Sequence, residues 1–116
     1  MHESSIVLSI LESTSKIRDE ENLEKIDTIK IVVGKMHQII PKFMYDLFAE
    51  MKMGFSGFEN TQLQLTEIDV YILCPDCGQK TNIAAEPIFI CPKCNSLNTE
   101  LVSGDEFYIE SIVGEK

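Results

Sequence analysis

Two CxxC segments organise this sequence, Cys74-Pro-Asp-Cys77 and Cys91-Pro-Lys-Cys94, and thirteen residues separate them. They contain all four cysteines of the 116-residue sequence. A CxxC turn places two sulfur atoms close enough to bind one metal ion, and a second turn against it completes a tetrahedral shell of four thiolates. The spacing therefore predicts a zinc ribbon, in which all four cysteines bind one structural Zn²⁺.

Two other chemistries fit the paired cysteines less well. Disulfides are disfavoured, because CxxC pairs in a chain without an export signal more often bind a metal. Iron also accepts four thiolates, and a C-P-x-C turn also occurs in rubredoxin-like sites. Those sites usually carry glycine after the second turn, where this sequence has Asn95, although Gly78 follows the first turn. We therefore expect zinc.

The charge of the chain is strongly acidic. Lys and Arg number 10 against 19 Asp and Glu, which gives a net charge of −9. Nucleic-acid binding requires a basic surface, so this balance counts against it. No apolar run approaches the roughly 20 residues that span a bilayer, and the N-terminus lacks the pattern of a signal peptide. We expect a cytoplasmic protein without a membrane span.

The residues before the cysteines predict a helix, a strand and a second helix. A helix ending near Arg18 is predicted by one apolar stripe, formed by Ile6, Val7, Ile10, Leu11 and Ile17. From Ile26 the apolar period changes to two, which predicts a strand ending at Gly34. The second helix begins at Pro41 and ends at Gly54. Its apolar stripe consists of Phe43, Met44, Leu47, Phe48 and Met51.

Strands are predicted on both sides of the cysteine segments. The alternation at Leu63 and Leu65 slips by one residue near Thr66 and Glu67, which indicates a bulge or a domain boundary. The last strand, residues 107–113, carries large apolar side chains on both faces. We therefore expect it to be central in its sheet.

These elements predict an α+β fold with an inserted zinc-ribbon domain. Residues 1–67 and 104–116 are expected to form the helix-strand-helix-strand domain, whose sheet the C-terminal strand completes. Residues 68–103 are expected to form the zinc ribbon.

The first three residues, Met1-His2-Glu3, offer a second metal site. Because His2 is bulky, Met1 is expected to be retained with a free α-amine. That amine, the His2 backbone nitrogen and the imidazole close adjoining chelate rings, and Glu3 can add its backbone nitrogen or its carboxylate. Four nitrogens in a plane suit Ni²⁺ or Cu²⁺ and suit Zn²⁺ poorly. The alternative is an ordinary terminal histidine without a metal.

Several motifs occur together in this chain. They are Met1-His2-Glu3, the run Ile31-Val32-Val33-Gly34 before Pro41, the two cysteine pairs, and the closing run from Val102 to Ile112. In combination they resemble the HypA nickel metallochaperones of hydrogenase maturation over essentially the whole chain. The resemblance implies a nickel-binding domain with a three-stranded sheet and two helices, plus a zinc domain.

The resemblance also implies a function and a set of ligands. The protein is expected not to be an enzyme, but to pass Ni²⁺ cargo, with a HypB-like GTPase, to the precursor of the [NiFe]-hydrogenase large subunit. We expect a monomer or a weak homodimer. The implied nickel ligands are the amine of Met1, His2 and Glu3. The implied zinc ligands are Cys74, Cys77, Cys91 and Cys94.

One loop departs from the family pattern. Relatives often have Gly-Glu-Leu-Ser-Gly where this chain has Gly34-Lys35-Met36-His37-Gln38. The family pattern therefore does not predict the contacts of this loop, and His37 is a further candidate to approach the nickel. A loop histidine is more often solvated than a ligand.

Two functions from other classes fit the sequence less well. A zinc-ribbon adaptor in transcription or RNA handling is disfavoured by the acidic charge, and it predicts that mutation of His2 is silent. A zinc hydrolase or deaminase needs an open coordination position, which four thiolates close. The deaminase pattern also requires H-x-E, whereas His2 and Glu3 are adjacent.

Overall fold

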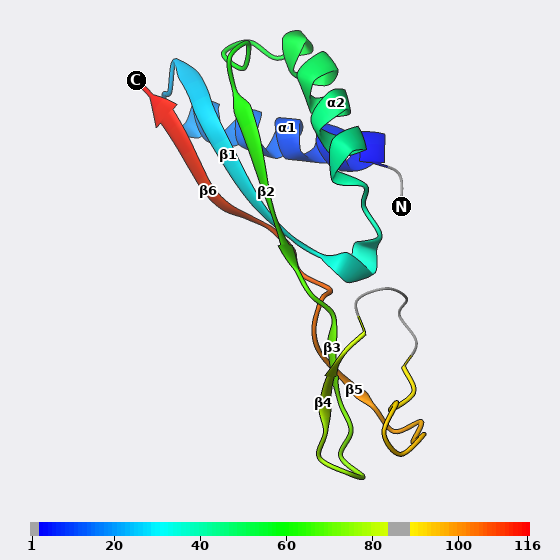
Figure 1. Cartoon of the computed structure of the whole chain (residues 1–116). Helices are drawn as coiled ribbons and strands as arrows, with labels where there is room; N and C mark the ends of the chain where they lie inside the picture. The colour runs from blue at the N-terminus through cyan, green and yellow to red at the C-terminus, as the bar shows by residue number, and fades with distance from the viewer. Residues whose placement is uncertain (1–2, 84–88) are drawn as a thin grey trace. The chain divides into compact units, whose positions relative to one another are not determined.

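The computed structural model describes residues 3–83 and 89–116. Within these ranges the strands form two three-stranded sheets, with strand orders β2-β1-β6 and β4-β3-β5. The elements marked η are short 3-10 helices. The elements are α1 (Glu3–Glu20), β1 (Lys25–Gly34), η1 (Lys35–His37), α2 (Pro41–Met51), η2 (Lys52–Gly54), β2 (Gln62–Ile68), β3 (Tyr71–Leu73), β4 (Lys80–Asn82), β5 (Glu100–Ser103) and β6 (Phe107–Glu115) (Figure 1).

The chain divides into two compact units. We call the first the sheet unit, which comprises the residues up to Ile31, Ile39–Thr66 and Tyr108–Lys116. The second, the ribbon unit, comprises Val32–Gln38 and Glu67–Phe107. The α+β fold class is confirmed, with two α-helices, a three-stranded sheet and a four-cysteine cluster in the described residues.

α1 packs its apolar stripe inward and runs across one face of the β2-β1-β6 sheet (Figure 1). Thr14 occupies the gap in that stripe and is buried as well. Its hydroxyl donates a hydrogen bond to the carbonyl of Ile10 at 2.8 Å, so the polar group is satisfied inside the core. The helix continues to Glu20, two residues past the predicted end at Arg18.

α2 also begins as predicted, with Pro41 in its first turn. Met44 and Phe48 are buried, but Phe43 is 51% exposed, so the buried stripe is narrower than expected. α1 and α2 contact each other. The α-helix ends at Met51, and a 3-10 turn carries the chain on to Gly54.

β1, and not the last strand, is central in the first sheet. The prediction that residues 107–113 form a central strand is wrong, because β6 lies at the edge. Ile31, Val32 and Val33 near the end of β1 are all buried, whereas Lys30 before them is exposed. In β6, Tyr108 is 52% exposed. Apolar side chains on both faces therefore did not identify the central strand.

Two glycines allow a close backbone approach inside the ribbon unit. A Cβ on Gly34 would overlap the carbonyl group of Gly104, and a Cβ on Gly104 would overlap Val70. Gly104 also has φ of +116°, a conformation that other residues adopt only with strain. The N–H of Met36 donates to the Gly104 carbonyl at 2.9 Å, which fixes η1 beside this segment.

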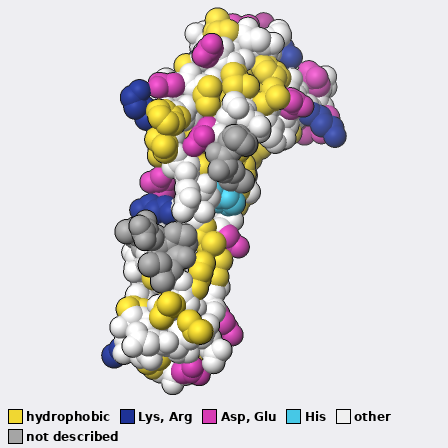
Figure 2. All heavy atoms as spheres, turned by 90° about the vertical axis from the view of Figure 1, so that its right-hand side faces the viewer, with side chains coloured by type: hydrophobic (Ala, Val, Ile, Leu, Met, Phe, Trp, Pro, Cys, Tyr) yellow, Lys and Arg dark blue, Asp and Glu magenta, His cyan; other side chains and the backbone are white. Residues whose placement is uncertain are grey.

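The surface carries no concentrated basic patch on the face shown in Figure 2, where acidic side chains are scattered and basic ones lie apart from each other. None of the helices in residues 3–83 and 89–116 is long and apolar enough to cross a membrane.

Candidate metal centre

The first cysteine turn follows directly from β3. β3 pairs antiparallel with β4, with Leu73 opposite Lys80, so the chain reverses direction through the turn. The N–H of Cys74 donates to the carbonyl of Gln79 at 2.9 Å, and the N–H of Gly78 donates back to Cys74 at 2.6 Å. Gly78 has φ of +73°, which glycine adopts without strain.

The second turn repeats this backbone pattern. The N–H of Cys91 donates to the carbonyl of Ser96 at 3.0 Å, and the N–H of Asn95 donates to Cys91 at 2.8 Å. Asn95 has φ of +60°, and asparagine tolerates this left-handed conformation better than most residues. The residue after the second turn therefore adopts the same type of conformation as Gly78 without being glycine.

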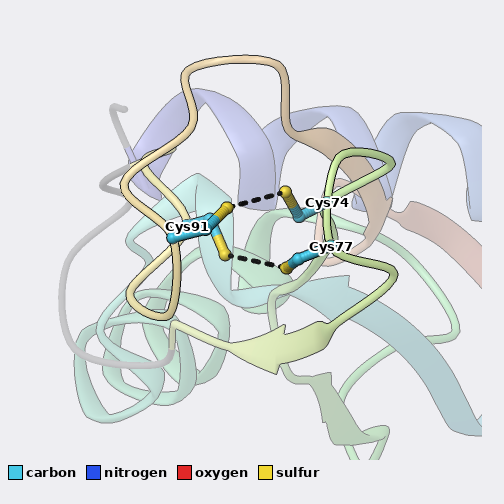
Figure 3. Close-up of side chains that lie close together, drawn as sticks. Cys74, Cys77 and Cys91 are labelled. Atoms are coloured by element: carbon cyan, nitrogen blue, oxygen red, sulfur yellow. Dashed lines mark hydrogen bonds between the residues drawn. The ribbon is translucent and has the colours of Figure 1, made fainter.

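The four sulfur atoms lie together, within 4.8 Å of one another. The Sγ atoms of Cys74 and Cys94 are 3.5 Å apart, and those of Cys77 and Cys91 are 3.6 Å apart. Figure 3 shows Cys77 pointing toward Cys91. A tetrahedral zinc ion with bonds of about 2.3 Å separates its sulfur ligands by about 3.8 Å, whereas a disulfide measures about 2.05 Å. The thiols are free, and their spacing fits a metal shell.

The thiols do not ionise independently. Backbone N–H groups of Cys94 and Lys93 lower the pKa of Cys91 to about 7. The N–H of Ser96 also lowers the pKa of Cys94, but the neighbouring thiol of Cys74 together with burial raises that pKa to about 12. Four adjacent thiolates would repel one another without a cation. A bound divalent ion supplies the compensating charge, and its binding releases protons.

Of the three predicted nickel ligands, the structure describes one. Met1 and His2 lie outside the described residues. Glu3 is the first residue of α1 and is partly buried. The nickel and zinc ligand sets both stay predictions.

His37 makes protein contacts that the sequence did not indicate. Its Nε2 lies 2.9 Å from the Asp105 carbonyl, and its ring stacks edge-on against Phe107 with centroids 5.8 Å apart. In the same loop, Lys35 forms an ion pair with Asp69 at 2.6 Å. The hydrogen-bonded ion pair with Lys35 lowers the pKa of Asp69. Lys35 and His37 thus fix this loop to other parts of the ribbon unit.

Polar side chains around the cysteines were missed by sequence reasoning. Asp76 accepts a hydrogen bond from the hydroxyl of Ser96, twenty residues further along the chain. Thr99 donates to the carbonyl of Phe89 at 2.7 Å and so closes the segment that carries the second turn. Loop residues of this kind have no periodicity that would reveal their partners.

Comparison with known proteins extends over nearly the whole chain. Residues 1–114 match the family model described as "Hydrogenase/urease nickel incorporation, metallochaperone, hypA". The chain belongs to the HypA family. The family is one of nickel metallochaperones in hydrogenase maturation and not of enzymes.

Among its relatives is the hydrogenase maturation factor HypA of Chlorobium limicola. That protein is 33% identical over 116 residues, which cover 100% of this chain and 98% of the relative. The HypA of Moorella thermoacetica is 29% identical over 116 residues, covering 99% of this chain and 100% of the relative. The similarity to these HypA proteins thus includes both the N-terminus and the cysteine turns.

Solved HypA structures share the fold. The solution structure of the Ni metallochaperone HypA from Helicobacter pylori superposes with a TM-score of 0.69 at 21% identity, covering 99% of this chain and 98% of that chain. A second solution structure of a HypA protein gives a TM-score of 0.68, also at 21% identity, and covers 97% of this chain and 94% of that chain. At this identity the likeness supports the fold alone.

Proposed function

We propose that this chain holds Ni²⁺ through the α-amine of Met1, His2 and Glu3. It then delivers the ion, together with a HypB-like GTPase, to the precursor of the [NiFe]-hydrogenase large subunit. The observation that carries the proposal is the family match over residues 1–114, which includes these three residues.

The position of Glu3 supports nickel binding at the N-terminus. The first N–H groups of a helix have no carbonyl partner within the helix. Because α1 begins at Glu3, nickel can replace the proton on the Glu3 backbone nitrogen without breaking a helical hydrogen bond, and the proton passes to solvent. The Glu3 carboxylate stands in the first helical turn, where a negative charge is favourable and offsets the unfavourable approach of a cation.

The cysteine site is suited to a structural role. The four thiolates leave no open coordination position, so the site offers neither a reactive water nor a place for exchangeable cargo. Soft thiolates favour Zn²⁺ there, while the nitrogen and oxygen donors at the N-terminus favour Ni²⁺. We propose Zn²⁺ as the resident ion and Ni²⁺ as the cargo. We further propose that the protein acts in the cytoplasm as a monomer or weak homodimer.

A transfer experiment tests the delivery function. The full chain, loaded with zinc and nickel, is mixed with the purified large-subunit precursor, with and without the GTPase and GTP. We expect nickel to move to the precursor, and His2→Ala to abolish the transfer because the cargo is lost. Lys16→Ala is the control, since this exposed side chain forms a surface ion pair with Glu20 on α1. If the wild-type chain transfers no nickel, both with and without the GTPase and GTP, the proposed delivery is contradicted.

A further inference from the structure

The two cysteine turns are related position by position. Asp76 and Lys93 each stand immediately before the second cysteine of their turn. Gln79 and Ser96 each stand two residues after that cysteine, and each accepts a backbone hydrogen bond from the first cysteine of its own turn. The backbone therefore repeats, while the side chains of Asp76 and Lys93 carry opposite charges.

Each of these side chains contacts the opposite turn. The Asp76 carboxylate accepts a hydrogen bond from the Ser96 hydroxyl and one from the Asn98 side-chain amide at 3.4 Å. In the other direction, Lys93 Nζ donates to Gln79 Oε1 at 3.4 Å. Two reciprocal contacts thus join the turns beside the sulfur atoms.

The two contacts differ in strength. Ser96 Oγ donates to a charged oxygen of Asp76 and at the same time accepts the N–H of Asn98 at 3.1 Å. A hydrogen bond to an ionised group in such a chain is stronger than one between neutral partners. The Lys93 contact also joins one charged and one neutral group, but it is long at 3.4 Å, and a hydrogen bond weakens with length. The contact between Asp76 and Ser96 is therefore the firmer of the two.

We propose that Asp76 is a positioning residue: through Ser96 it holds the two cysteine turns together and slows the release of the bound metal ion. Separation of the two turns divides the four-thiolate shell in half and so opens a route for the ion to leave. The Asp76 contact opposes that movement without touching the metal. The inference rests on the proposed occupancy of the cysteine site by a metal.

The release rate of zinc tests this role. The zinc-loaded full chain is mixed with an excess of a chromogenic chelator, and absorbance reports the zinc that leaves. Mutation of residues that hold metal ligands in place typically weakens metal binding by about 10-fold or more. We therefore expect Asp76→Ala to release zinc about 10-fold faster than the wild-type chain. Ser96→Ala should behave alike, and the double variant should add little, because both changes remove the same contact. Lys93→Ala is the matched control and should stay within about twofold of wild type.

Cobalt substitution separates this role from a loss of folding. Each variant is loaded with Co²⁺, and an unchanged ligand-field spectrum shows that the four-thiolate shell is intact. Should Asp76→Ala fail to bind cobalt, Asp76→Asn retains an acceptor without the charge and should release zinc at an intermediate rate. A wild-type chain without metal at the cysteines would refute the metal centre itself. If Asp76→Ala binds metal and releases it at the wild-type rate or slower, only the positioning role is overturned. If Asp76→Ala does not bind metal, the same result in Asp76→Asn overturns that role.

Discussion

Removing the metal from the cysteine site should unfold the segment 67–107 and leave the sheet unit folded. In the described part of this segment the buried apolar side chains, apart from the cysteines, are Val70 and Ile72, which are 3% and 1% exposed. Their burial contributes about 3–6 kcal/mol in total at about 1.5–3 kcal/mol each. Structural zinc supplies about 10–16 kcal/mol in small zinc-binding peptides. The metal is therefore the larger source of stability.

Amide hydrogen exchange measured by NMR, with and without a chelator, resolves the two units. The N–H groups of Cys74 and Cys91 donate to backbone carbonyls in the turns, and we expect them to exchange rapidly once the metal is removed. The amides of Ile26 and Ile29 in the central strand should keep their protection, which controls for global unfolding. Slow exchange at the amides of the two cysteines in the metal-free chain would show that the metal is not needed to fold the segment 67–107, because polypeptide contacts alone would then hold the turns.

Three further changes test the packing and the charges. Phe48→Ala should lower the free energy of unfolding, measured in urea, by about 3–5 kcal/mol. Phe43→Ala, at an exposed position, should change it by about 0.5 kcal/mol or less. Equal losses in the two variants would contradict the assignment of Phe48 to the core. Lys35→Ala should raise the pKa of Asp69 toward 3.8 in an NMR titration, and an unchanged pKa would exclude the ion pair. Because folding lowers the pKa of Asp69, the ion pair stabilises the folded chain at pH values above the pKa that Asp69 has in the unfolded chain. This stabilisation is lost as the pH falls through the pKa of Asp69 in the folded chain. Gly104→Ala should cost about 1–3 kcal/mol, since φ is +116° there, and an unchanged unfolding midpoint would contradict the strain.

Much of the fold was predictable because its signals are local. The CxxC spacing fixes the turn geometry within a few residues, and the helical stripe and strand alternation depend on neighbours in the sequence. The stripe of α1 has a gap at Thr14, and this polar residue is buried with its apolar neighbours. Pro41 marked the beginning of α2 because a proline in the first turn loses no helical hydrogen bond.

Strand order and loop contacts were not predictable in this way. The apolar faces of β6 gave no information about its neighbours, and the strand lies at the edge. Phe58 and Thr61 are fully buried in the connection before β2, where no periodicity marks them. Thr61 donates to the carbonyl of Ile26 at 2.6 Å, a contact between residues 35 positions apart. Such pairs depend on tertiary structure, as does the contact between Asp76 and Ser96.

A Ni²⁺ titration of the zinc-loaded chain tests whether the N-terminus holds the proposed nickel site. The chain with its own Met1 is compared with His2→Ala and with a variant that carries one additional N-terminal residue, while absorbance reports planar nitrogen coordination. We expect one nickel ion per chain for the first protein and loss of the planar signal in both variants. Equal binding by all three proteins would contradict it, because the amine of Met1 and the imidazole of His2 would then not be ligands.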